Sequence, residues 1–470
     1  MIPLFMKKKI LLLFIVITPL FTSCFEDNDD NIQTSSELDI KNFIYRGLNF
    51  FYLYKADTPE LANDAFVNQD ELNDFLNSYD SPESLFDYLK SPQDRFSLLV
   101  DDYIELENTL NGITKNHGME FGLVYYPNGS NNVFGYARYI LPGTDAEAKG
   151  LERGVIFNTI NGEQINDTNY RNLLELEVYT IGLATIEGED IIPTEESIEL
   201  IKEEYTENPI YIAETLTIEG QKVGYLMYNS FTKDFDPQLN AVFAQFQADG
   251  ITNLILDLRY NGGGSVETAI DLSSMITGQF NAQLFVNEEW NDDRQADYAA
   301  PNLFNNQIHT GEAINSLNLN QVYVLTTSSS ASASELVING LDPYITVAQV
   351  GGTTTGKFQA SFLLYDAPAP NFSRNQANPG HTYAMLPLVF KTVNANGFTD
   401  YIDGLDPEIE YLEDYANLGV LGDINEPLLA TALNDIFPNP QPLPRNNIQF
   451  EEISESKALL PAYQLMIIEK

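Results

Sequence analysis

The stretch that decides the fold is "TTSSSASASELVINGL", residues 326–341. An apolar run at 322–325 precedes it and is typical of a buried strand. A cluster of small residues follows, and from about Ser334 the apolar residues are spaced as on one face of a helix. A serine at such a strand-to-helix junction lies at a helix N-terminus. Free N–H groups there favour the anion that forms when a nucleophile attacks a carbonyl.

A second stretch, "GGTTTGKF" at 351–358, raises the question of what Lys357 does. Its G-x-x-x-x-G-K spacing is that of a phosphate-binding loop, and "LILD" at 254–257 imitates the strand that holds Mg²⁺ in such enzymes. However, Phe358 stands where a Ser or Thr hydroxyl must reach the metal, and "LILD" precedes the loop instead of following it. Nucleotide is therefore a disfavoured partner, and Lys357 needs another role.

A third motif, "LDLRYNGGG" at 256–264, reads as a buried strand that ends in a glycine turn ahead of a helix. Glycine permits the backbone of another chain to approach closely. Asp257 and Arg259 are expected to anchor this turn and not to act in catalysis.

Together these motifs resemble the C-terminal processing peptidases, or tail-specific proteases, a family of serine peptidases with a Ser/Lys dyad and a PDZ-like domain. The matching residues are S-A-S-A-S-E at 330–335 and the downstream G-K loop. The resemblance implies that the middle serine, Ser332, is the nucleophile and that Lys357 is its general base. The activity expected is that of an endopeptidase.

The resemblance also implies the residues around the dyad. An N–H of the glycine turn, at Gly263 or Gly264, is expected to form the oxyanion hole with the N–H of Ala333. Many members place a glutamine four residues after the lysine, where this chain has Ser361, while Gln359 comes two after. Either of these two is a candidate for orienting the lysine.

A lysine can act as a base only when it is neutral. Its free pKa is about 10.4, but burial away from acidic groups lowers it by several units. No carboxylate lies close to Lys357 in the sequence. Ser332 would attack the peptide carbonyl, Lys357 would take and return its proton, and water would release the acyl-enzyme.

Upstream, "FGLVYY", "ARYILPGTDAEAKGLERG" and "VIFNTINGEQI" occur in an order that resembles a PDZ domain. The resemblance implies that a loop at Phe121-Gly122-Leu123 presents N–H groups to a peptide C-terminal carboxylate and that the peptide adds a strand to the sheet edge. Protein or peptide substrates bound through the C-terminus are therefore the expected partners.

Other chemistries have weaker support. The three histidines, His117, His309 and His381, show no H-E-x-x-H or paired metal spacing, so neither a metal nor another cofactor is expected. A Ser-His-Asp triad with His309 or His381 stays open. A different class also stays open, namely a catalytically inactive peptide-binding module of the same fold.

The N-terminus resembles a lipoprotein signal. Three lysines at 7–9 precede an apolar run at 10–21 that is too short to span a bilayer, and Cys24, the single cysteine, follows in "PLFTSC". We expect an exported protein that is lipid-anchored through Cys24 in the bacterial cell envelope, on the periplasmic or the surface face. The formal charge of −44 makes nucleic acid an unlikely target.

The expected fold class is multidomain α+β, with a small N-terminal helical domain, a PDZ-like β-rich domain and an α/β protease core. The predicted boundaries are 1–23 for the signal peptide, 24–37 for an acidic tether, 38–111 for the helical domain, 112–205 for the PDZ-like domain, 206–432 for the core and 433–470 for a C-terminal tail.

Overall fold

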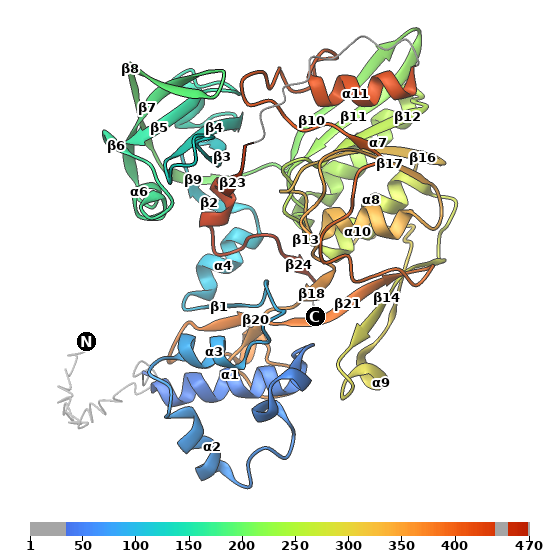
Figure 1. The fold of residues 1–470 in the computed structure, drawn as a ribbon. Helices are drawn as coiled ribbons and strands as arrows, with labels where there is room; N and C mark the ends of the chain where they lie inside the picture. Colours follow the sequence, from blue (N-terminus) through green and yellow to red (C-terminus); the bar gives the residue numbers. More distant parts are fainter. Residues whose placement is uncertain (1–33, 438–449, 469–470) are drawn as a thin grey trace, which may run out of the picture.

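The computed structural model describes residues 34–437 and 450–468. The predicted signal peptide, Cys24 and most of the acidic tether lie outside the described residues. Across the described part of the chain, no helix combines the length and apolar character that a membrane span requires. The mixed α+β architecture expected from the sequence is confirmed (Figure 1).

The first helix, α1 (Glu37–Phe51), begins where the sequence predicts. Ser36 accepts the N–H of Asp39, and the Asp39 carboxylate accepts the N–H of Ser36, which is a reciprocal capping box. The other elements of this region are α2 (Gln69–Leu76), α3 (Pro82–Leu89), β1 (Leu98–Val100) and α4 (Tyr103–Leu110), with 3₁₀ turns at Lys55–Asp57 and Pro59–Leu61.

These helices share a core with the rest of the molecule. Phe43 and Phe51 of α1 belong to the same buried apolar cluster as Val389 and Phe390, which are distant in sequence. The approach is close, since a Cβ at Gly47 would lie 1.9 Å from a methionine methyl carbon. The N-terminal region is therefore built into one wall of the core.

A β-rich domain follows, with its own apolar cluster. Its largest sheet has the order β23-β3-β4-β5-β7-β8, with β6 paired to β5. The strands are β3 (Met119–Tyr125), β4 (Val133–Ile140), β5 (Ile156–Ile160), β6 (Glu163–Gln164), β7 (Val178–Glu187), β8 (Asp190–Ile201) and β23 (Glu452–Glu455). The short helices α5 (Asp145–Ala148) and α6 (Tyr170–Leu174) and the pair β2 (Ile113–Asn116) and β9 (Glu203–Thr206) complete it.

The segment Phe121-Gly122-Leu123 differs from its expected form. The sequence predicts a loop there, whereas the structure places all three residues inside β3. The side chains of Phe121 and Leu123 are buried in the domain core, and the backbone pairs with β4 on one side and β23 on the other. Burial and two ladders together hold the segment extended.

The α/β core is a six-stranded sheet that is parallel from β11 onward. The strands, in spatial order, are β10 (Ile210–Ile218), β11 (Gln221–Tyr228), β12 (Asn253–Asp257), β16 (Gln321–Thr326), β17 (Thr346–Gly351) and β22 (Ile409–Glu410). Helices α7 (Asp236–Asp249), α8 (Val266–Thr277) and α10 (Ala333–Leu341) pack on one face, and α11 (Pro427–Ile436) packs on the other (Figure 1). Strand runs alternating with helices thus form the layered core that the sequence predicts.

A second six-stranded sheet stands beside this core. Its order is β13 (Gly264–Ser265), β24 (Met466–Ile467), β18 (Gln359–Ser361), β21 (Leu388–Asn394), β14 (Leu284–Trp290) and β15 (Pro301–Leu303). A third, small sheet joins β1 to β20 (Ala384–Leu386) and β19 (Leu364–Tyr365), and α9 (Gln295–Tyr298) follows β14. The remaining 3₁₀ turns are Lys233–Phe235, Arg374–Gln376 and Ser456–Leu459.

Part of the predicted C-terminal tail belongs to regular helices and sheets. Residues 433–436 continue α11, and β24 lies between β13 and β18 as an internal strand of the second sheet. The last described residues of the chain therefore lie in the region where the predicted catalytic motifs meet.

Candidate active site

Ser332 lies at the junction between β16 and α10, as the sequence predicts. It is the N-cap of α10, its side chain is fully buried, and its backbone has a φ of 65°. A non-glycine residue in that conformation is strained and persists only where its surroundings fix it. Asn261 supplies part of that support, because its carbonyl accepts the N–H of Ala331 and the hydroxyl of Ser334, both at 3.0 Å.

One buried carboxylate, that of Glu335, joins the two halves of the predicted dyad. Its Oε2 accepts the N–H of Ser332 at 2.7 Å and the N–H of Lys357 at 2.8 Å. Its Oε1 accepts the N–H of Gly356 and the hydroxyl of Thr354, each at 2.6 Å. Burial raises the pKa of Glu335, and these hydrogen bonds oppose that rise.

Lys357 is fully buried within the loop at 351–358. Loss of solvent lowers the pKa of Lys357 to about 7, while the charges of Asp94 and Glu335 act in the opposite direction. Its Nζ lies 4.9 Å from the centre of the Phe96 ring and donates to the carbonyl of Gln464 at 2.7 Å. A substantial fraction of this lysine is therefore neutral near pH 7, as a general base requires.

The same loop is poorly suited to hold a phosphate, because four consecutive amides, at 354–357, already have acceptors. Thr354 and Thr355 donate their N–H groups to backbone carbonyls at 3.1 and 3.0 Å. The next two amides, including that of Lys357, donate to Glu335. A phosphate at this position would face the Glu335 carboxylate and would find none of these four amides available.

The glycine turn separates the two candidates for the oxyanion hole. Gly263 donates its N–H to the side-chain oxygen of Asn261 at 2.8 Å, whereas Gly264 donates its N–H to the carbonyl of Leu465 at 2.6 Å. The φ of Gly264 is 136°, and a Cβ there would lie 2.4 Å from the carbonyl oxygen of Phe231. Of these two glycines, Gly264 is therefore the one whose amide binds a carbonyl from outside the turn.

Ala333 is the first residue of α10. An N–H in the first turn of a helix has no intrahelical acceptor, and it lies at the positive end of the helix dipole. Together with Gly264, this position can stabilise a developing oxyanion beside Ser332.

The comparisons with known proteins agree with this geometry. The model of peptidase family S41 matches residues 222–365, and the model of the S41 N-terminal domain matches residues 39–98. These two segments belong to peptidase family S41. The first of these S41 segments contains the glycine turn, Ser332 and Lys357.

Several relatives of known name are similar to about half of this chain. A carboxyl-terminal-processing protease of Picosynechococcus sp. is 27% identical over 233 residues, 48% of this chain and 52% of that protein. A chloroplastic C-terminal processing peptidase of Tetradesmus obliquus is 22% identical over 228 residues, 46% of either chain. The chain spans about half the length of the curated relatives it matches.

The similarity to solved structures extends over more of this chain than the similarity to the curated relatives. A Bacteroides fragilis protein assigned to the S41 proteases is 25% identical, with a TM-score of 0.66 over 85% of this chain and 98% of that one. The photosystem II D1 C-terminal processing protease is 17% identical, with a TM-score of 0.50 over 84% and 98% of the two chains. The second likeness supports the fold alone.

The three histidines each have a polar partner outside the dyad. His309 pairs with Asp236 at 3.1 Å, His381 pairs with Asp366 at 3.1 Å, and His117 contacts the hydroxyl of Tyr179 at 2.6 Å. Both candidate triad histidines therefore have partners other than Ser332. Within residues 34–437 and 450–468, no cluster of three or more potential ligands could hold a metal ion.

Asp257 and Arg259 form the structural anchor that the sequence predicts. Both are buried, and Arg259 donates to Asp257 and to Glu426, the N-cap of α11, at 2.8 Å each. These contacts fix the chain just before the glycine turn.

The two candidates for orienting the lysine have other surroundings. Gln359 donates its side-chain amide to the hydroxyl of Tyr54 at 2.7 Å. The hydroxyl of Ser361 is buried, and it has no hydrogen-bond partner among the described residues. The role of these residues towards Lys357 stays a prediction.

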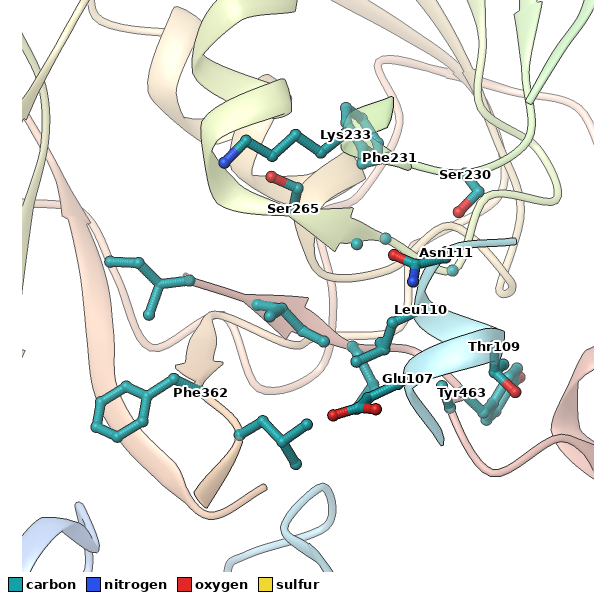
Figure 2. Close-up of a pocket in the computed structure, with 18 of the residues that line it drawn as sticks. Glu107, Thr109, Leu110, Asn111, Ser230, Phe231, Lys233, Ser265, Phe362 and Tyr463 are labelled. Carbon is teal, nitrogen blue, oxygen red and sulfur yellow. The ribbon is translucent and has the colours of Figure 1, made fainter. Parts of the chain in front are cut away.

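A cavity of about 490 Å³ opens next to the glycine turn. Figure 2 shows Leu110, the last residue of α4, and the following Asn111 facing Phe231 and Ser265 across it, with Phe362 on a further side. Tyr463, from the C-terminal segment, also lines this space. A cavity of this size has room for substrate side chains.

Sequence reasoning missed four contributors to the site. Glu335 is visible only as the last letter of S-A-S-A-S-E, and its four hydrogen bonds cannot be read from that. Asp94 and Phe96 come from the loop after α3, and Gln464 comes from the C-terminal segment. No local signal marks these long-range neighbours of Lys357.

Proposed function

We propose that this protein is a serine endopeptidase that cleaves proteins or peptides near their C-termini with a Ser332/Lys357 dyad. The observation that carries the proposal is the link through Glu335, which fixes the backbone of the buried, weakly basic lysine to that of a serine at a helix N-terminus. S41 membership and the carboxyl-terminal-processing relatives support the same reaction class.

The residues assign each step of the reaction. Neutral Lys357 takes the proton of the Ser332 hydroxyl, and Oγ forms a bond to the substrate carbonyl carbon. The N–H groups of Gly264 and Ala333 stabilise the resulting oxyanion. When the C–N bond breaks, the lysine returns the proton to the leaving amine. A water, deprotonated by the same lysine, then hydrolyses the acyl-enzyme.

Substrate capture is assigned to the β-rich domain, which we propose acts as a PDZ-like domain. The outer edge of β3, at Phe121-Gly122-Leu123, accepts an added antiparallel strand, as β23 demonstrates within the chain itself. Addition of a peptide strand to a sheet edge is the recognition mode of PDZ domains. A C-terminal carboxylate on the substrate would distinguish chain ends from internal segments.

The location proposed is the bacterial cell envelope, through a lipid on Cys24. Support comes from the sequence of the signal and of the single cysteine after it. A Cys24→Ser variant should be released from membranes or remain unprocessed, and fractionation of cells checks this. Equal membrane retention of the variant would contradict the anchor.

Hydrolysis of an unstructured protein tests the proposed reaction. Ser332→Ala and Lys357→Arg should both be inactive, because guanidinium stays protonated at working pH. Ser328→Ala, at an exposed neighbouring serine, is the matched control and should keep activity. Full hydrolysis by Ser332→Ala would contradict the dyad. Peptide binding by the wild type without any hydrolysis would favour the inactive binding module.

A further inference from the structure

Residues 451–468 connect the two sites assigned to substrate. Figure 1 shows this segment, coloured red, running from β23 beside β3 to β24 beside β13 and β18. It thus passes first along the proposed peptide-binding edge of β3. It then passes along the catalytic groove, by which we mean the space beside Ser332, Lys357 and Gly264. We refer to it below as the C-terminal segment.

At the first site the C-terminal segment takes the place of an added peptide. Ser454 pairs with Leu123 and Glu455 pairs with Gly122 in an antiparallel ladder. The next residue, Ser456, accepts the N–H of Phe121 through its hydroxyl at 3.1 Å. The backbone edge that would bind a substrate strand is therefore occupied.

A buried arginine holds this part of the C-terminal segment in place. Arg138 of β4 is 2% exposed and forms ion pairs with both Glu452 and Glu455. It also donates to the hydroxyl of Ser329 at 3.0 Å, just upstream of Ser332. Charge-assisted contacts in a buried setting are among the stronger hydrogen bonds. Arg138 thus connects the β-rich domain, the C-terminal segment and the catalytic strand-to-helix junction.

At the second site the C-terminal segment accepts hydrogen bonds from the proposed catalytic groups themselves. Lys357 donates its Nζ to the carbonyl of Gln464 at 2.7 Å, and Gly264 donates its N–H to the carbonyl of Leu465 at 2.6 Å. Beyond them, Ile468 donates its N–H to the carbonyl of Ser361 at 2.9 Å. Base and proposed oxyanion donor are each bonded to a neighbouring peptide carbonyl, as they would be to a substrate backbone.

The Leu465 carbonyl also lies against the nucleophile. A Cβ at Gly263 would meet the Leu465 carbonyl oxygen at 2.6 Å and the Ser332 Cβ at 2.7 Å, so both atoms approach the same side of that glycine. Yet Ser332 Oγ has no hydrogen-bond partner among the described residues. The segment is therefore bound like a substrate while the serine is not coupled to its base.

We propose that residues 451–468 are an intramolecular substrate mimic that keeps the peptidase latent, and that protein substrates act by displacing this segment from the β3 edge and the catalytic groove. This inference rests on the proposed function for its consequence, although occupancy of the groove can be tested without catalysis. A tethered segment competes at a high effective concentration, so free peptides bind only the minor population in which it has left.

Two variants release the C-terminal segment in different ways. Leu465→Asp places a charge at a side chain that is 6% exposed, which disfavours the docked state. Deletion of residues 460–468 removes the groove-filling part and leaves β23 paired to β3. Either variant should hydrolyse an unstructured protein at least about tenfold faster than wild type, since the competent population rises. Glu451→Gln, at an exposed residue of the same segment, should remain at the wild-type rate.

Binding to the Ser332→Ala background separates this inference from the proposed reaction. A fluorescent peptide with the sequence of residues 460–468 should bind the Ser332→Ala deletion variant and should bind Ser332→Ala alone at least about tenfold more weakly. Tighter binding to the deletion variant without hydrolysis by any Ser332-containing form would overturn the reaction but support the occupied groove. Equal binding to both forms would overturn the substrate mimic.

Intact-mass measurement of the wild type completes the test. The inference predicts that incubation leaves the C-terminal segment whole. Conversion to a product that ends at Leu465, absent in Ser332→Ala, would show that the segment is a substrate and would overturn its role as a mimic.

Discussion

Glu335 and Lys357 are joined at the backbone: the carboxylate Oε2 of Glu335 accepts the N–H of Lys357 at 2.8 Å. The same oxygen accepts the N–H of Ser332. The general base and the nucleophile come from different elements, and their relative position therefore depends on one buried side chain.

Replacing that carboxylate should uncouple the pair. In Glu335→Gln the side-chain nitrogen cannot accept a hydrogen bond. Either the N–H of Gly356 loses its acceptor, when the nitrogen takes the Oε1 position, or the N–H groups of Ser332 and Lys357 do, when it takes the Oε2 position. We expect a loss of about 2–4 kcal/mol in the free energy of unfolding, as for buried unsatisfied donors, together with a fall in kcat. Denaturant unfolding and peptide hydrolysis measure both. Glu105→Gln, at an exposed glutamate, is the control, and equal behaviour of the two variants would contradict the coupling.

The pH dependence of activity should report Lys357. Because its pKa is about 7, the neutral form grows and the rate rises as pH increases through 7. The ring of Phe96 lies 4.9 Å from Nζ and favours the charged form. Phe96→Leu should therefore move the rise in kcat/KM to lower pH by about 0.5 to 1 unit. Phe66→Leu, remote from the lysine, should not move it; a shift to higher pH in Phe96→Leu would contradict the assignment.

The pH dependence of stability should also report Lys357. Its folded pKa is lower than its unfolded value, so the unfolded chain binds more protons between pH 7 and about 10.4, and stability rises with pH in that window. Lys357→Met should be more stable than wild type at pH 7, by on the order of 1–4 kcal/mol. The advantage should shrink towards pH 10. Urea unfolding across pH tests this, and a variant less stable at pH 7 would contradict it.

The glycine turn offers a matched pair of substitutions. Gly264→Ala would force a Cβ to within 2.4 Å of the Phe231 carbonyl at a φ of 136°, so the turn and its oxyanion donor should shift. We expect a fall of at least about 100-fold in kcat, as for a lost oxyanion-hole donor. Gly262→Ala, where the nearest atom would be 3.5 Å away, should change kcat little. Equal losses in both variants would count against Gly264.

The parts of the fold that the sequence predicts correctly rest on local signals. The small-residue junction places Ser332 at the start of α10, the apolar run before it forms β16, and Ser36 caps α1. In each case the residue types within a few positions determine the conformation. The S41 core was therefore predictable to within a residue or two at these points.

The parts that could not be predicted depend on contacts between distant segments. The Phe121-Gly122-Leu123 strand is extended because β4 and β23 flank it, and β23 is more than three hundred residues away in sequence. Phe96 reaches Lys357 because the N-terminal helices share the core of the second sheet. The docking of Gln464 and Leu465 has no local signal either, because the hydrogen bonds to Lys357 and Gly264 are accepted by backbone carbonyls, which every residue type has.

The rate of acylation at Ser332 tests the central claim most directly. A fluorophosphonate probe should modify Ser332, identified by peptide mass mapping, in the Leu465→Asp form of the chain. The dyad predicts that the rate rises through pH 7 and that it falls at least about 100-fold in Lys357→Ala, as when a positioned general base is removed. Modification at a different serine, or an unchanged rate in Lys357→Ala, would contradict the Ser332/Lys357 dyad.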